Sequence, residues 1–428
     1  MRQLTSLDAQ FLALENDRQT GHVGSLSLYD GDLDCGAVRE LVRERLPLLP
    51  PFRYRLAEVP LGLDYPYWVD DTEFDLDYHV RELALPTPGS DQQLAAQVAR
   101  IHARPLDRSR PLWELYVIHG LKSGQVGLLS KIHHAIIDGL SGAEIMGLLL
   151  DLSPEGREMP DPPAVTDGAA AGAPGSVEML GRGLLGVPKY PARVARALPS
   201  TLPNISDVPA IFGAIPGAGT IGRLAGAVQK AAGGPAPPRT KLTAPKTSFN
   251  GRLSPHRRFA FGQLPLEDVK EVKNHYGVTV NDVVVAICAS AVRHWLIDHE
   301  ELPEDPLIAQ IPVSVRTGEQ IGTYGNRILL MASALHTEES DPVQRLMATH
   351  EAMREVKERH KALPAQLLQD ANHFIPPAIF SRAAGLTFRM STSGLGRPAW
   401  NLVISNVPGP QIPLYLAGAR LDANYPVS

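Results

Sequence analysis

A segment rich in proline, glycine and alanine divides the chain, and this division constrains the fold more than any other feature. Residues 151–240 contain 14 of the 38 prolines in the 428-residue sequence. On either side, short apolar runs of two-residue period alternate with segments of helical period, which is typical of α/β domains. Because 428 residues exceed one ordinary core, we expect two domains. The predicted boundaries are 1–155, a partly helical crossover at 156–247, and 248–428.

The N-terminal part shows the clearest alternation. Apolar alternation predicts strands at 22–31 and 66–80 and a hairpin of core strands at 112–121 and 125–134. Helical periodicity predicts helices at 35–50 and 90–105. A third helix is expected to begin at Ser141, since Ser141 and Glu144 have the spacing of a capping box.

The C-terminal part repeats this pattern after the crossover. Strands are expected at 257–264, 306–316, 326–336 and 399–409, and helices at 266–277, 282–299 and 341–361. Asn281 is expected to cap the second of these helices. Within the crossover, 176–198 and 207–231 keep enough apolar residues for amphipathic helices, between disordered joints at 153–175 and 232–247.

Composition excludes several classes of protein. A net charge of -5 gives no general attraction for nucleic acid. Cys35 and Cys288 are the only cysteines, and Cys288 lies in an apolar run, so we expect neither a disulfide nor a cysteine-based zinc site. The N-terminus lacks the apolar stretch of a signal peptide, and we find no apolar run of about 20 residues. We therefore expect a soluble or peripheral protein of a reducing compartment.

The stretch "LSKIHHAIIDGLSG" at 129–142 is the main candidate for chemistry. Side chains alternate along a strand, so His133 and His134 should point to opposite sides, with one facing a cleft and the other the interior. Asp138 is expected at the start of the next helix, where amide dipoles favour an anion, and Gly139 permits a sharp turn. A packed or solvent-exposed position is the commonest explanation for a single histidine, but the adjacency of the two, their place at a strand end and the acid and glycine that follow make it less favoured here. A metal site would need a third ligand that the sequence does not offer, whereas proton transfer needs one imidazole near a hydroxyl substrate.

This stretch matches the HHxxxDG motif of acyl-CoA-dependent acyltransferases related to chloramphenicol acetyltransferase and to peptide-synthetase condensation domains. Further segments occur in family order, and together the chain resembles the bacterial wax ester synthase/acyl-CoA:diacylglycerol acyltransferase family over nearly its whole length. The further segments are "LTSLDAQFLALEN", "HVGSLSLYDG", "RPLDRSRPLWELYVIHGL", "NDVVVAICASAVRHWL", "PVSVR", "GNRILLMASALHT" and "NLVISNVPGPQIPLYLAGARL". The resemblance implies two chloramphenicol acetyltransferase-like subdomains with the active site in a tunnel at their interface.

The resemblance also implies a mechanism. His134 would act as the general base that takes the proton from the hydroxyl of diacylglycerol or a long-chain alcohol, while that oxygen attacks the acyl-CoA thioester. Transfer would be direct, without an acyl-enzyme and without a cofactor other than the acyl-CoA substrate. His133 would support His134, and Asp138 would hold the turn by pairing with Arg316. The alternatives are a condensation-type enzyme that uses a carrier-bound acyl donor and a non-catalytic relative that binds lipid.

Three other segments carry family motifs whose residues also have ordinary structural explanations. Asn281 and Asp282 match the ND motif, but are equally explained as a helix cap and a first-turn acid. Substrate binding is predicted for two groups of residues, of which the first is more readily explained by core packing: Pro111, Leu112 and Trp113, and then Ser405, Asn406 and Pro408. The resemblance further implies a cytoplasmic enzyme with peripheral contact to a membrane or lipid droplet. Family members usually continue beyond the last residue of this sequence, so a C-terminal piece is expected to be missing.

Overall fold

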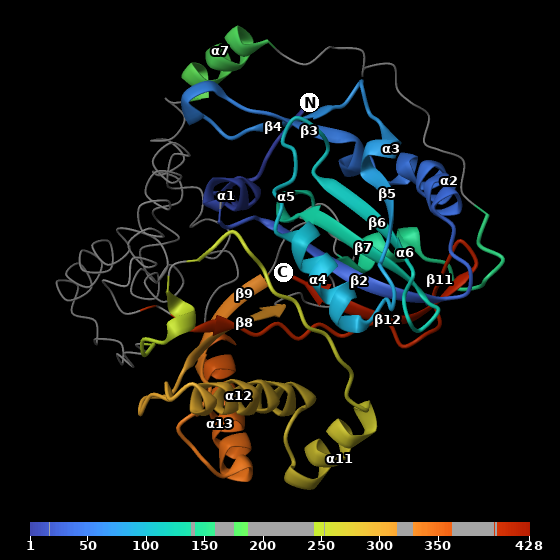
Figure 1. Ribbon diagram of the computed structural model, residues 1–428. Helices are drawn as coiled ribbons and strands as arrows, with labels where there is room; N and C mark the ends of the chain where they lie inside the picture. The colour runs from blue at the N-terminus through green and yellow to red at the C-terminus, as the bar shows by residue number, and fades with distance from the viewer. Residues whose placement is uncertain are drawn as a thin grey trace.

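The computed structural model describes residues 1–16, 18–137, 142–158, 175–186, 244–251, 253–314, 328–361, 398 and 400–428. Within these ranges, helices and sheets form a larger part around a six-stranded sheet and a smaller part around a three-stranded sheet (Figure 1). The α/β class expected from the sequence is confirmed. The helices and strands used below are β1 (Arg2–Gln3), α1 (Ser6–Leu14), β2 (His22–Asp30), α2 (Cys35–Arg45), β3 (Tyr54–Ala57), β4 (Tyr67–Asp70), α3 (Leu76–His79), β5 (Val80–Ala84), α4 (Asp91–His102), β6 (Trp113–His119), β7 (Val126–His133), α5 (His134–Ile137), α6 (Gly142–Leu149), α7 (Ser176–Gly186), α11 (Leu266–Tyr276), α12 (Val280–Asp298), β8 (Ile308–Ser314), β9 (Ile328–Ala334), α13 (Pro342–Lys361), β10 (Leu402–Val403), β11 (Tyr415–Leu416) and β12 (Ala419–Val427).

The six-stranded sheet positions the histidine pair. Its strand order is β11-β12-β2-β7-β6-β5, antiparallel throughout except for the parallel pair of β5 and β6. β6 and β7 form the predicted hairpin, in which Trp113 pairs with Ile132. On the other side of β7, His22 of β2 pairs with His133. The C-terminal end of β7 therefore lies inside the sheet, with a partner strand on each side.

Both faces of this sheet are buried. Leu128 and Ile132 of β7 belong to a cluster with residues of α2 and α6, while Leu129 belongs to a second cluster with residues of α4. This alternation follows from the two-residue period of a strand. Helix α4 begins at a capping box in which Ser90 and Gln93 bond each other's backbone N–H groups, so the helix expected at 90–105 is confirmed.

The smaller part is built on the sheet β10-β8-β9, in which β10 is parallel and β9 antiparallel to β8. Val285 and Ala289 of α12 are fully buried in one cluster with Ile311 of β8, Met331 of β9 and Met353 of α13. The helices expected at 266–277, 282–299 and 341–361 are confirmed as α11, α12 and α13. Gly277 ends α11 with a φ of 68°, a left-handed conformation that glycine adopts without strain.

The last strand returns to the larger sheet. β12 is antiparallel to β2, from Arg420 opposite Asp30 to Val427 opposite Gly24, and Figure 1 shows this red strand beside blue β2. Residues 419–427 were not predicted to form a strand. Residues 419–427 fall within the predicted C-terminal domain at 248–428, yet they complete a sheet whose other long strands come from residues 22–133. Residues on both sides of the predicted boundary at 248 therefore contribute to the larger sheet.

Several expectations differ from the structure. Residues 257–264 form no strand, although Phe259 and Phe261 pack against the core cluster beside α4. The segment 66–80 contains β4, then the short helix α3 and the start of β5, rather than one strand. The strand expected at 125–134 ends at His133, because His134 begins α5. Of the two crossover helices, the first is present as α7, and the second, at 207–231, lies outside the described residues.

Helix α12 is the one described helix that is long and apolar enough to cross a membrane, judged by length and composition. It has 19 residues and a mean hydropathy of 1.4 over its most apolar window. Its fully buried residues, however, pack against β8 and β9 in the core of the smaller part. One side of α12 packs in this core, while only 33% of its most apolar window is buried.

Candidate active site

The two histidines of the motif stand where β7 ends and α5 begins. The backbone N–H of His133 donates to the carbonyl of Leu112 at 2.9 Å, and the N–H of His134 donates to the carbonyl of Gly21 at 2.9 Å. Leu112 precedes β6 and Gly21 precedes β2, so both neighbouring strands hold the backbone of the pair. His133 ends the strand and His134 begins the helix, so the pair does not continue the strand alternation on which its predicted opposite orientation depended. That orientation stays a prediction.

His133 is buried, with a 1% exposed side chain. Its Nδ1 accepts a hydrogen bond from the N–H of Ala135 at 3.0 Å. A neutral imidazole with an accepting Nδ1 carries its proton on Nε2. That Nε2 lies 3.2 Å from Oε1 of Glu15. Both ring nitrogens therefore face protein groups, which agrees with the supporting position predicted for His133.

The Glu15 carboxylate faces three donors. Oε1 accepts from the N–H of Gly21 at 2.7 Å and lies near His133, while Oε2 accepts from the guanidinium of Arg108 at 2.8 Å. Burial raises the pKa of Glu15, but the contacts with His133, Gly21 and Arg108 together outweigh it and hold the pKa at about 2. Glu15 is consequently an anion at any pH near neutrality.

His134 is half-buried and lies against an aromatic ring. The rings of His134 and Phe11 are stacked, with centroids 4.4 Å apart and an angle of 9° between their planes. Phe11 belongs to α1, which begins at a capping box formed by Thr5 and Asp8. The imidazole is thus held on one face by a ring from a separately capped helix, an arrangement that restricts its rotation.

The remaining motif residues are not described. Asp138 and Gly139, and also Arg316, lie outside the described residues. The predicted pairing of Asp138 with Arg316 therefore stays a prediction. Among the residues that the structure describes, no group of three His, Cys, Asp or Glu side chains could hold a metal ion.

The Pro-Leu-Trp segment lies in the core of the larger part. Leu112 and Trp113 are 0% exposed, and the indole Nε1–H of Trp113 donates to the carbonyl of Phe52 at 2.7 Å. His79 stacks on Trp113 at 4.4 Å. Pro111 is buried as well. These contacts agree with the packing explanation. The Leu112 carbonyl links this segment to the backbone of His133. Substrate binding by the three residues stays a prediction.

The ND motif lies at the start of α12, but Asn281 does not cap this helix. The cap is Thr279, which forms a capping box with Asp282, so the predicted cap at Asn281 is wrong. Asp282 is the expected first-turn acid: it is 1% exposed, and its Oδ2 lies 2.7 Å from Nδ1 of His350 on α13. Thr279 and Asp282 have the Thr-x-x-Asp spacing of a capping box, which indicated a helix cap two residues before Asn281.

Two predicted site residues from distant segments meet. The side-chain amide of Asn406 donates to Oδ1 of Asn281 at 3.3 Å, so the segment after β10 contacts the start of α12. Ser405 and Pro408 are exposed in the same segment. The structure therefore brings the ND motif and the Ser405–Pro408 segment together.

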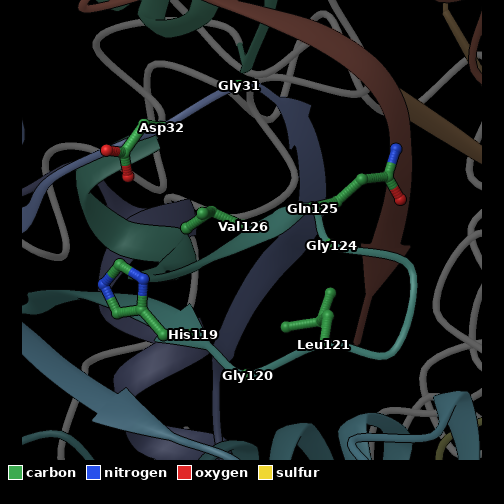
Figure 2. A pocket seen from close by; sticks show the side chains of 8 residues that line it. All are labelled: Gly31, Asp32, His119, Gly120, Leu121, Gly124, Gln125 and Val126. Atoms are coloured by element: carbon green, nitrogen blue, oxygen red, sulfur yellow. The ribbon is translucent and has the colours of Figure 1, made fainter.

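The described part of the chain also has a pocket of about 430 Å³, which lies away from the histidines. Figure 2 shows its lining at the turn between β6 and β7 and the end of β2. Val126 lines this pocket and begins β7, whereas His133 ends the same strand. Seven strand steps separate the two, about 23 Å at 3.3 Å per residue. This pocket is therefore distinct from the candidate active site. Its lining residues are Gly31, Asp32, His119, Gly120, Leu121, Gly124, Gln125 and Val126.

Comparison with known proteins identifies the family. The family model described as the wax ester synthase/diacylglycerol acyltransferase catalytic domain matches residues 4–284. The chain belongs to the wax ester synthase/diacylglycerol acyltransferase family. A model of the C-terminal domain of the same family matches residues 324–428. The resemblance seen in the sequence is confirmed, and the protein is an acyltransferase.

Relatives of this acyltransferase match it over almost its whole length. A putative diacylglycerol O-acyltransferase of Mycobacterium tuberculosis is 35% identical over 100% of this chain and 80% of its own length. The probable diacylglycerol O-acyltransferase tgs2 of the same organism is 35% identical over 98% of this chain and 87% of its own length. The solved wax ester synthase/diacylglycerol acyltransferase from Marinobacter aquaeolei VT8 is 29% identical with a TM-score of 0.66, and covers 100% of this chain and 87% of that one. This structural match confirms the fold.

Two residues that contact the histidine pair of this acyltransferase were missed by sequence analysis. Phe11 stacks on His134 and Glu15 faces His133, and both come from the segment "LTSLDAQFLALEN". Phe11 and Glu15 are four positions apart, and the sequence therefore indicated that their side chains lie on the same side of a helix. Their partners, however, lie more than 100 positions away, and no local pattern indicates that contact.

Proposed function

We propose that this enzyme forms triacylglycerol from diacylglycerol and acyl-CoA, with His134 as the general base. The observation that carries the proposal is the unequal burial of the motif histidines. His133 is fully buried with both ring nitrogens facing protein groups, whereas His134 is half-buried beside it. Of the pair, His134 is the less buried imidazole, which favours it as the one that meets the substrate.

In the proposed reaction, the acceptor hydroxyl oxygen attacks the carbonyl carbon of the thioester while its proton moves to the His134 imidazole. The tetrahedral intermediate then collapses with cleavage of the carbon–sulfur bond. The imidazolium protonates the departing thiolate, so the products are one ester and one molecule of CoA. The proton that His134 takes in the first step is the one that it gives back in the second.

Direct transfer needs positioning as well as proton transfer. A general base supplies about 10²- to 10⁴-fold of rate acceleration. Holding the hydroxyl and thioester in reactive geometry supplies the larger part, because well-oriented reactants reach effective molarities of about 10⁵ M or more. The stacked Phe11 ring and the backbone bond to Gly21 support this role, since both fix where the His134 ring stands.

The choice of diacylglycerol over a long-chain alcohol is supported by the relatives, whose names specify diacylglycerol O-acyltransferases.

We expect the full chain, given one radiolabelled acyl-CoA, to yield labelled triacylglycerol and an equal amount of free CoA. We expect kcat/KM for diacylglycerol to exceed that for a C16 alcohol by at least about tenfold. A preference for the alcohol would refute the acceptor assignment. Transfer only from a carrier-bound acyl donor, or no transfer from any donor, would refute the proposal as a whole.

Peripheral contact with a membrane or lipid droplet also stays a prediction. Exposed apolar side chains on α7 and on the turn that it contacts give it some support: Val177, Leu184 and Leu61 are 84%, 57% and 76% exposed. Apolar side chains on one outer region are the kind of surface that binds at a lipid interface.

A further inference from the structure

The end of α1 contacts both motif histidines. Phe11 stacks on His134, and Glu15, four positions later, places its carboxylate 3.2 Å from Nε2 of His133. Helix α1 also packs directly against α5, which begins with His134. One short segment of chain therefore reaches the pair from one side.

The Glu15 side chain is 13% exposed and joins three segments of the larger part. Its carboxylate accepts from the Gly21 N–H ahead of β2 and from Arg108 ahead of β6, and it faces His133 at the end of β7. All three partners present N–H groups. A carboxylate has acceptors only, so it opposes none of the three. It accepts hydrogen bonds from Gly21 and Arg108, while Nε2 of His133 lies 3.2 Å from Oε1 without hydrogen-bond geometry.

Gly21 connects Glu15 to His134. The N–H of Gly21 donates to Glu15 at 2.7 Å, and its carbonyl accepts from the His134 N–H at 2.9 Å. The chain passes so close to the pair at this point that a Cβ on Gly21 would lie 2.8 Å from Nε2 of His133 and 3.0 Å from the carbonyl oxygen of Phe11. Gly21 therefore has no side chain that could anchor it, and its hydrogen bond to the Glu15 carboxylate fixes its peptide group instead.

We propose that Glu15 is a positioning residue for the acyl-transfer reaction. Its carboxylate fixes the Gly21 backbone, which holds His134, and it also fixes the position of the proton on the neighbouring His133 ring. Glu15 acts through these neighbours. The inference rests on the proposed role of His134 as general base, and its test distinguishes failure of one from failure of the other.

Glutamine cannot replace Glu15 at this position without losing a contact. If its amide oxygen faces Gly21 and His133, its NH₂ group faces the Arg108 guanidinium. If the oxygen faces Arg108, the NH₂ group faces two N–H donors. Glu15→Gln therefore removes the charge and leaves two donors opposed, with almost no change in side-chain volume.

For Glu15→Gln in the full chain we expect kcat to fall by about 10- to 100-fold while KM for acyl-CoA and diacylglycerol stays within about twofold. The acid limb of the kcat profile should move to lower pH by a few tenths of a unit, because a lost anion near the pair disfavours the imidazolium form of His134. The matched control is Glu58→Gln. Glu58 is an exposed carboxylate that contacts the same Arg108 at 3.2 Å, and its loss should leave kcat and the pH profile unchanged.

A second variant, Glu15→Asp, keeps the charge and withdraws the carboxylate by one methylene. Its kcat should fall with the acid limb in the wild-type place. The contrast with the shifted limb of Glu15→Gln is the readout that a merely structural role does not predict. His134→Ala is measured in the same series. Wild-type kcat in Glu15→Gln or Glu15→Asp beside an inactive His134→Ala would overturn the positioning role and leave the general base intact. An active His134→Ala would overturn the general base itself.

Discussion

Replacing His134 by alanine is expected to lower kcat by about 10²- to 10⁴-fold with little change in KM for acyl-CoA. The substitution removes the less buried imidazole of the pair, since His133 is buried with both ring nitrogens facing protein groups. The loss corresponds to about 3–5 kcal/mol of transition-state stabilisation. Initial rates of CoA release with saturating diacylglycerol measure it.

The control for this variant is His256→Ala, which removes an exposed imidazole far along the sequence from the motif and should keep the wild-type rate. Because His134 also stacks on Phe11, the thermal unfolding of the variant is recorded to confirm that it is folded. A folded His134→Ala enzyme whose kcat lies within threefold of wild type would rule out general-base catalysis by this residue.

The second large effect concerns stability. Asp151→Asn is expected to lower the free energy of unfolding by about 3–5 kcal/mol, because removing one member of a buried ion pair leaves the other charge without compensation. Nη2 of Arg45 lies 2.6 Å from Oδ2 of Asp151, and both side chains are 3% exposed. Arg45 also donates to the carbonyl of Leu148 at the end of α6, and the Asp151 backbone pairs with Tyr415 of β11. The pair thus joins α2, α6 and the C-terminal strands.

Urea denaturation of the full chain measures this loss. Glu40→Gln provides a control on the same helix, α2, since it removes an ion pair with Arg43 in which the two side chains are 68% and 54% exposed. Exposed pairs of this kind contribute about 0.5 kcal/mol or less. If Asp151→Asn and Glu40→Gln lower the free energy of unfolding by the same amount, the buried ion pair does not stabilise the fold more than the exposed one.

Local patterns predicted most elements of the fold but not their long-range pairing. The hairpin of β6 and β7 and the helices α4 and α11 follow from apolar periodicity, capping residues and a terminal glycine. Strand β12 was missed although Ala419, Ala423 and Val427 are buried at regular intervals along it. Its partner β2 lies about 400 residues earlier, and no local pattern specifies such a pairing. The twist and burial of the whole sheet decide it.

The same limit applies to the site. His133 and His134 were recognisable because the motif is contiguous, whereas the change from strand to helix at His134 was not predicted. Glu15 was not recognisable, because its significance comes from Gly21, Arg108 and His133, which meet only in the folded chain. Sequence identifies a chemical group when the motif is local, and tertiary structure supplies the residues that hold it.

The central claim is direct transfer of the acyl group to the acceptor with His134 as base. Its most direct test is to mix stoichiometric enzyme and acyl-CoA without acceptor, quench the mixture rapidly, and measure both the intact protein mass and the free CoA. Direct transfer predicts an unmodified protein mass and no burst of CoA until diacylglycerol is added, when CoA and triacylglycerol form together. A protein heavier by one acyl group, formed with a stoichiometric burst of CoA before the acceptor is present, would contradict it.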